Sequence, residues 1–192
     1  VDEKVSKKVW DGIKKLEKLG AKVVDISLPL TKAALSAYYI IATAEASTNL
    51  AKFCGLRYGL HLDLKGNFNE YFSEVRSAGF GEEAKRRVML GTFVRMAGYR
   101  AQYYLKALKV RRLLIEEFEK TFSKVDEIAS PTMPVIAPKF SEIKKLTPLE
   151  NYLMDVLTVP ANLAGLPHIS VPAGEVNGMP VGLQFIGEHF QE

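Results

Sequence analysis

The stretch DVLTVPANLAGLPHISVPAGEVNGMPVGLQFIG, residues 155–187, decides the fold of this chain. It contains two short apolar runs, at 169–172 and 181–187, and the pair Asn177-Gly178 lies between them. An Asn-Gly pair between two apolar runs is typical of a β-hairpin, because both residues accept the positive φ that a tight turn requires. The stretch therefore predicts two strands joined by a short turn.

A helix is predicted immediately before this hairpin. Thr147 and Glu150 have the spacing of a capping box, with a proline at the first helical position. The pair at 159–160, Val-Pro, interrupts the helix, and Gly165 ends it. At about 100° per residue, Asp155 falls beside the apolar stripe of this helix, which consists of Leu149, Leu153 and Val156.

The N-terminal part has the pattern of an α/β unit. Apolar residues recur there at helical spacing, at Val5, Val9, Ile13 and Leu16. Gly20 is placed to end this helix. Residues 23–28 then alternate as a strand would, up to Pro29. Residues 31–53 are helical in pattern and poor in charge, which predicts a helix, or a pair of helices, buried inside a protein larger than this chain.

The middle of the chain is predicted to be mainly helical. Residues 60–81 contain repeated glycines and are expected to form a loop. Residues 82–122 return to helical spacing, with charged side chains on the exposed side. Residues 125–130 predict a short strand that Pro131 closes.

Composition narrows the class of protein. The chain has 192 residues, of which 47% are hydrophobic, and this suits one compact globular unit. No apolar run approaches the ~20 residues that span a bilayer, and the N-terminal residues lack a secretion signal. A single cysteine, Cys54, favours a reducing cytoplasm. The net charge of +4 is too small and too scattered to indicate nucleic-acid binding.

Several common catalytic motifs are absent. The sequence contains no GxSxG nucleophile elbow, no phosphate-binding P-loop and no dinucleotide-binding glycine motif after a strand. His61, His168 and His189 share no ligand spacing, so no metal site is expected. Cys54 is expected to be a buried, inert thiol, and Ser170 a packed hydroxyl in a strand rather than a nucleophile.

Two charged positions keep a binding function open. Arg87 belongs to the basic group at 85–87, near the start of an otherwise apolar helix, where a cation opposes the helix dipole and often has a partner. Asp155 flanks the apolar stripe described above. A guanidinium and a carboxylate that line one pocket could hold the two ends of a free amino acid. A solvated basic turn and a structural carboxylate are the alternatives.

The hairpin stretch resembles the core of the amidase signature family, in DVLTVPANLAGLPHISVPAG followed by GMPVGLQFIG. Upstream, YYIIATAEASTNLAKF, GLRYG, FGEEAKRRVMLGT and KVRRLL are similar to the A-subunit family of the glutamine-dependent aminoacyl-tRNA amidotransferases. Cys54 stands where that pattern favours a polar residue, and the segment at 94–96 is unusual for it. Neither difference touches the residues carried over below.

The resemblance implies an α/β fold, an α/β/α sandwich around a mixed central sheet, of which residues 1–192 are the C-terminal portion of a single domain. The activity it implies is glutamine hydrolysis by a Ser–cis-Ser–Lys triad through an acyl-enzyme. The nucleophile-bearing segment is expected to precede this chain. No catalytic residue is therefore assigned here, and the chain alone is expected to be inactive.

By the same resemblance, Arg87 matches the arginine that binds the α-carboxylate of glutamine, and Asp155 the aspartate that binds its α-ammonium. Tyr38, of the pair Tyr38-Tyr39, matches a tyrosine near the acyl site. The expected partners are subunits B and C, together with an aminoacyl-tRNA held mainly by a partner subunit. ATP and magnesium are expected on that partner, with no cofactor on this chain, and the acceptor is Glu-tRNA(Gln) or Asp-tRNA(Asn).

Two other functions remain open at this point. A stand-alone amidase of the same fold would act on another amide, although a neutral amide needs neither Arg87 nor Asp155. A non-catalytic module would bind RNA or another protein, and RNA binding would depend steeply on salt concentration.

Overall fold

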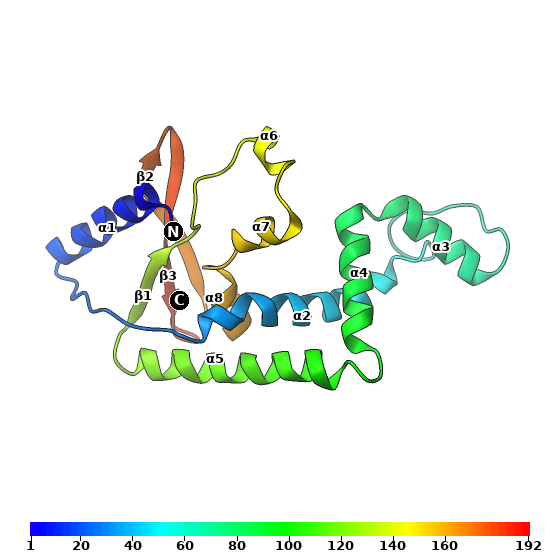
Figure 1. Cartoon of the computed structure of the whole chain (residues 1–192), viewed down its shortest axis with the longest axis horizontal. Helices are drawn as coiled ribbons and strands as arrows, with labels where there is room; N and C mark the ends of the chain where they lie inside the picture. The colour runs from blue at the N-terminus through cyan, green and yellow to red at the C-terminus, as the bar shows by residue number, and fades with distance from the viewer. The chain divides into compact units, whose positions relative to one another are not determined.

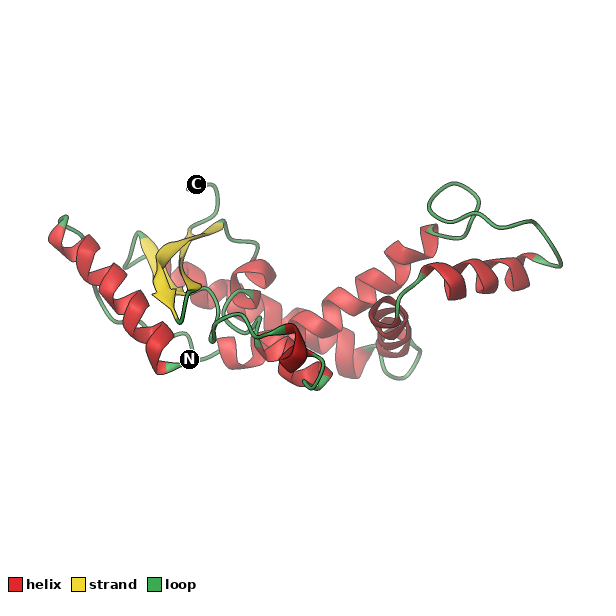
Figure 2. Cartoon of the chain, turned by 90° about the horizontal axis from the view of Figure 1, so that it is seen from above, coloured by secondary structure: helices red, strands yellow, loops and turns green.

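The computed structural model describes all residues 1–192, and they form two compact units. Unit 1 contains Val1–Leu35 and Val110–Glu192, and unit 2 contains Ser36–Lys109. The length had predicted a single compact unit. Most of the chain is helical, and the only strands belong to one small sheet in unit 1 (Figure 2). None of the helices combines the length and the apolar character that crossing a bilayer requires.

The sheet of unit 1 has the order β1-β3-β2 and is antiparallel throughout. Its strands are β1 (Glu127–Pro131), β2 (His168–Val176) and β3 (Met179–Gly187). The β2–β3 turn has positive φ at both Asn177 (53°) and Gly178 (74°). The predicted hairpin is therefore confirmed, and both β2 and β3 are longer than the runs predicted at 169–172 and 181–187.

One face of the sheet packs on α1 (Glu3–Lys18), as Figure 1 shows. The apolar stripe predicted for this helix is the part that is buried. Val5, Val9 and Ile13 form one core with apolar side chains of the hairpin, which are Val176, Val181 and Leu183. The Asp2 side chain accepts bonds from the first backbone N–H groups of α1, so the helix begins at a side-chain cap.

Side chains alternate along β3, so Gln184 points to the face opposite α1. The helical segments α6 (Phe140–Ile143), α7 (Pro148–Leu153) and α8 (Val159–Ala164) lie between β1 and β2 in the sequence. The predicted capping box at Thr147 and Glu150 is present at the start of α7. Gly165 ends α8 in the left-handed conformation, as predicted.

Unit 2 is helical. It contains most of α2 (Thr31–Asn49), then η1 (Leu50–Lys52), α3 (Phe68–Gly79), α4 (Glu82–Arg95) and the π-helical turn η2 (Ala101–Leu105). The helix α5 (Lys106–Phe122) begins in unit 2 and continues in unit 1. Within unit 2, α4 crosses α2 at Gly91, whose α-carbon lies against the backbone carbonyl of Thr43.

Several predictions about local structure are wrong. Residues 23–28 form no strand, and Val23, Val24 and Ile26 are exposed, because no other strand of the chain pairs with them. The loop predicted at 60–81 contains α3, which begins at a capping box formed by Asn67 and Glu70. The spacing of Asn67 and Glu70 is the sequence signal for this helix, and the prediction from the glycines alone did not use it.

Other predictions need smaller corrections. The helix predicted over 82–122 is broken after Arg95, and Gly98 has a positive φ of 88° in the break. The helix at 31–53 exists as α2 and η1, and few of its residues are buried within this chain, so its burial inside a larger protein stays a prediction. The short strand at 125–130 is β1, shifted by one or two residues. The three strands of this chain form an antiparallel sheet, and the mixed sheet that the resemblance implies for the whole domain stays a prediction.

Candidate functional site

Arg87 is held by a carboxylate of its own helix. Its Nε lies 2.9 Å from the Glu83 Oε1, one turn earlier in α4, and the neighbouring Arg86 also binds Glu83. The first turn of α4 carries Glu82 and Glu83, which complement the positive end of the helix dipole. The sequence analysis expected a partner such as a ligand for this cation and did not identify Glu83. The i,i+4 spacing of Glu83 and Arg87 is the sequence signal for this pair.

The tyrosine pair of α2 lies beside this arginine. The guanidinium carbon of Arg87 is 6.0 Å from the ring centroid of Tyr39, which is within the range of a cation–π contact. The rings of Tyr38 and Tyr39 meet edge to face with centroids 5.2 Å apart. Unit 2 thus brings the predicted arginine and the predicted tyrosine pair together. The cation–π contact is made by Tyr39, whereas the prediction named Tyr38.

Asp155 lies in unit 1, in the turn between α7 and α8. The predicted helix ends at Leu153, so the prediction that Asp155 lies on its face, beside the apolar stripe, is wrong. It is half-buried, and its backbone oxygen accepts bonds from the N–H groups of Thr158 (3.1 Å) and Val159 (3.0 Å). The Thr158 hydroxyl donates to the same oxygen at 3.1 Å. The turn therefore has a defined backbone. Because Asp155 and Arg87 belong to different units, their pairing stays a prediction.

A set of polar side chains lies along β3 on the face opposite α1. Gln184 is 1% exposed, and its Nε2 donates to Ser130 Oγ (3.2 Å) and to the backbone oxygen of Leu157 (3.1 Å). Thr132, just after β1, and Ser170, in β2, share a hydroxyl–hydroxyl bond of 2.6 Å that passes over Gly182 of β3, the strand between them. Ser170 lies in a strand, as predicted, but it is exposed, so the prediction of a packed hydroxyl is wrong. Sequence reasoning did not single out Gln184, since one glutamine in an apolar strand carries no motif.

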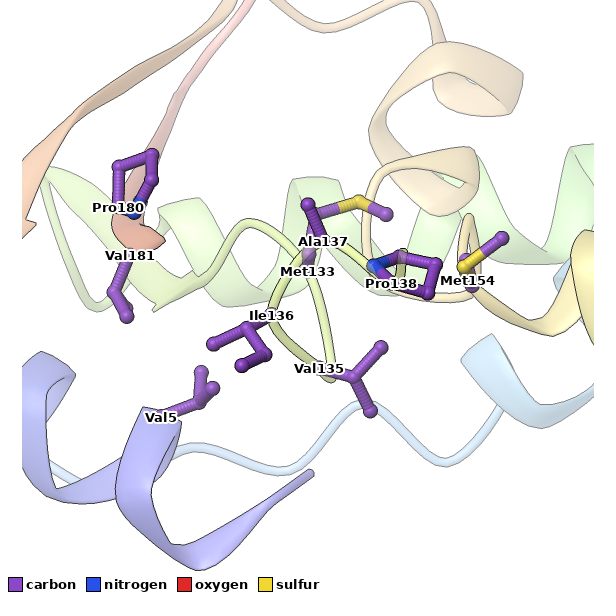
Figure 3. Close-up of a pocket in the computed structure, with 10 residues that line it drawn as sticks. Val5, Met133, Val135, Ile136, Ala137, Pro138, Met154, Pro180 and Val181 are labelled. Carbon is purple, nitrogen blue, oxygen red and sulfur yellow. The ribbon is translucent and has the colours of Figure 1, made fainter. Parts of the chain in front are cut away.

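An apolar pocket of about 150 Å³ lies in unit 1, close to α1 and β3 (Figure 3). Its lining contains only apolar side chains and one glycine, and Val5, Ile136, Met154 and Val181 are among them. It therefore offers no charged or hydrogen-bonding side chain to either end of an amino acid. Its chemistry suits an apolar group and differs from that of the Arg87 and Asp155 positions.

The remaining titratable side chains do not gather into a metal site. No group of three or more His, Cys, Asp or Glu side chains is placed to hold a metal ion. Each histidine ring is instead bonded to a backbone oxygen: His61 to Gly55 (2.7 Å), His168 to Leu166 (3.1 Å) and His189 to Ala164 (3.2 Å). These rings anchor loops.

Comparison with known proteins gives consistent results. The family model described as Amidase matches residues 1–192. The chain is 53% identical over 192 residues to the A subunit of glutamyl-tRNA(Gln) amidotransferase from Geobacillus sp. (strain WCH70), with all of this chain and 39% of that protein aligned. It is 50% identical to the protein of the same name from Methanospirillum hungatei JF-1, with all of this chain and 44% of that protein aligned.

A solved structure agrees with these relatives. The crystal structure of the glutamyl-tRNA(Gln) amidotransferase A subunit from Thermotoga maritima is 44% identical and superposes with a TM-score of 0.71. The match covers 99% of this chain and 36% of that one. The chain therefore spans about two fifths of the length of the proteins it matches.

Proposed function

We propose a function for this chain, which belongs to the amidase family across all of residues 1–192. We infer that it is part of the glutamine-hydrolysing, ammonia-generating subunit of a tRNA-dependent amidotransferase. The observation that carries the proposal is 53% identity across the whole chain to a relative named as the A subunit of glutamyl-tRNA(Gln) amidotransferase. The reaction of the intact enzyme would convert Glu-tRNA(Gln) or Asp-tRNA(Asn) to its amide form.

In this proposal the chain supplies the residues that hold free glutamine. Arg87 binds the α-carboxylate, Asp155 binds the α-ammonium, and Tyr38 stands near the acyl site. The Glu83 carboxylate, 2.9 Å from Arg87 Nε, and the ring of Tyr39 support this role, because together they orient the guanidinium before substrate arrives. A group oriented in advance loses less conformational entropy when it binds.

The catalytic step is assigned to another part of the protein. We propose that residues 1–192 are the C-terminal portion of a single amidase-signature domain, an α/β/α sandwich with a mixed central sheet. The coverage of 39% of a relative's length supports the part of this proposal that makes the chain a portion of a longer protein. The Ser–cis-Ser–Lys triad would lie outside residues 1–192, so this chain by itself would not hydrolyse glutamine.

The proposal also includes partners. Subunits B and C would complete the enzyme, in the cytoplasm, and the ammonia would pass to the subunit that holds the aminoacyl-tRNA. ATP and magnesium would act on that partner, where ATP activates the side-chain carboxylate of the misacylated residue. This chain would bind no cofactor.

The test is a substrate comparison with the complete enzyme, partners included. Arg87→Ala should lower kcat/KM for glutamine by about 10-fold to 100-fold, the effect of losing a charge-assisted bond. Turnover of a simple neutral amide should be retained. Arg86→Ala is the matched control, since Arg86 binds the same Glu83 from the same turn of α4, and it should retain both activities.

Two other results would favour the alternative functions. Equal loss of glutamine and simple-amide turnover in a folded Arg87→Ala variant would contradict the amino-acid site and favour a stand-alone amidase. Salt-dependent RNA binding without any amide turnover in the complete protein would favour the non-catalytic module.

A further inference from the structure

Gln184 is a buried polar residue whose bonds reach the turn that carries Asp155. It sits in the middle of β3, directly opposite Ser130 in the β1–β3 pairing, and is 1% exposed. Its Nε2 donates to Ser130 Oγ at 3.2 Å and to the backbone oxygen of Leu157 at 3.1 Å. Gln184 thus connects the sheet to the segment between α7 and α8.

The orientation of this amide follows from its partners. A backbone oxygen can only accept a hydrogen bond, so the NH2 end of Gln184 must face Leu157. The other end of the amide, Oε1, is buried without a donor. A buried acceptor without a donor costs about 1–3 kcal/mol. Methionine has nearly the same shape and would avoid that cost, so what distinguishes Gln184 is the pair of bonds that its Nε2 donates, to Ser130 Oγ and to the Leu157 backbone oxygen.

The bond to Leu157 acts on the backbone next to Asp155. Leu157 is two residues beyond Asp155, and the next two N–H groups, of Thr158 and Val159, both donate to the Asp155 oxygen. The Thr158 hydroxyl donates to the same atom. A continuous chain of bonds therefore runs from β3 through Leu157 and Thr158 to the backbone of Asp155.

We propose that Gln184 is a positioning residue for Asp155. By fixing the turn on the sheet, it places the carboxylate where it receives the α-ammonium of glutamine, and it thereby contributes to selection of a substrate that carries an amino group. The inference rests on the proposed function, in which Asp155 binds that ammonium. Gln184 itself touches neither the substrate nor the reacting atoms.

The test compares two substrates in the complete enzyme with its partners: L-glutamine, and 4-carbamoylbutanoate, which is glutamine without the α-amino group. Gln184→Met keeps the shape but removes the donor. It should raise KM for glutamine. It should also lower the substrate ratio, which is kcat/KM for glutamine divided by kcat/KM for 4-carbamoylbutanoate, by about 10-fold to 100-fold. The kinetics of 4-carbamoylbutanoate should change little. Gln184→Glu, measured in parallel, should show the same loss at neutral pH and recover as a lower pH protonates the carboxylate and restores a donor.

Val176→Ala is the control for a purely structural effect. Val176 is buried in the core between α1 and the hairpin, so its truncation loosens the same sheet without touching the turn. It should leave the substrate ratio unchanged. If Gln184→Met and Gln184→Glu behave like Val176→Ala, lowering both activities equally, the positioning role is overturned.

A double mutant separates this inference from the proposed function. Asp155→Asn alone should lower the substrate ratio, and adding Gln184→Met should then have no further effect on it, because Gln184 acts through Asp155. If Asp155→Asn changes nothing, the ammonium site is wrong and this inference falls with it. If Asp155→Asn lowers the ratio but Gln184→Met does not, only the role of Gln184 is wrong.

Discussion

At the scale of single residues, neighbours decide what a side chain does more than its type does. Arg87 is a cation near the start of a helix, and it forms a salt bridge with the carboxylate of Glu83, one turn earlier. Gly91 is a glycine inside a helix, a position at which alanine is ordinarily favoured. In unit 2 it is required, since a β-carbon there would meet the carbonyl carbon and oxygen of Thr43 on α2.

We expect Gly91→Ala to destabilise unit 2 by about 1–3 kcal/mol, because the backbone of α2 would have to move away from the added methyl group. Hydrogen exchange of the α2 and α4 amides measures this as lost protection. Gly79→Ala is the matched control, because its β-carbon would lie 3.7 Å from Leu60, an ordinary contact. Unchanged protection in Gly91→Ala would contradict the close crossing of α2 and α4.

At the scale of elements, the beginnings and ends of helices follow from local bonds. At the start of α7, the carboxylate of Glu150 accepts the Thr147 backbone N–H at 2.7 Å and the Thr147 hydroxyl at 2.8 Å. These bonds, the backbone one first, hold the pKa of Glu150 below its usual range. The sequence predicted this cap because all of its members lie within four residues.

The cap should depend on pH. Since the pKa of Glu150 is lower in the folded state, its contribution to stability is present above the ordinary glutamate pKa and is lost as the pH falls through the lowered one. Carboxyl carbon NMR measures that pKa. Thr147→Ala should raise it partly, and Thr147→Pro, which removes the backbone donor as well and fits the φ of −67°, should raise it further. No change in either variant would contradict the bonds.

The β2–β3 turn offers a second test at this scale. Gly178 has a φ of 74°, and a β-carbon added there would meet nothing within 4 Å. Gly178→Ala should therefore destabilise the hairpin only through backbone strain, by about 1–2 kcal/mol. Gly81→Ala is the control, because that glycine is equally open but has a φ of −66°. The melting temperature should fall for the first variant and stay nearly constant for the second.

At the scale of the whole chain, a large amount of apolar surface is exposed. Large apolar side chains are exposed in both units, among them Val24, Leu64, Met89, Phe140 and Phe190. Residues 23–28 have the alternation of a strand but no strand to pair with. Apolar surface of this kind favours association with another protein surface or with further copies of the chain.

We therefore expect the isolated chain to associate. Sedimentation velocity should show species heavier than the 21.4 kDa monomer, in a proportion that rises with concentration. A charged substitution in the exposed stretch, Val24→Lys, should reduce the association, whereas Lys22→Arg should not. A clean monomer that melts in one cooperative step would contradict the expectation.

The sequence by itself determined the features that depend on a few consecutive residues. Asn177-Gly178 specified the hairpin turn, Thr147 with Glu150 specified the start of α7, and Gly165 specified the end of α8, because local φ, ψ and short-range bonds suffice for each. The tertiary structure alone decided which segments find partners. Residues 23–28 are not a strand in this chain, and Gln184 reaches Leu157, because pairing and burial depend on groups far apart along the chain.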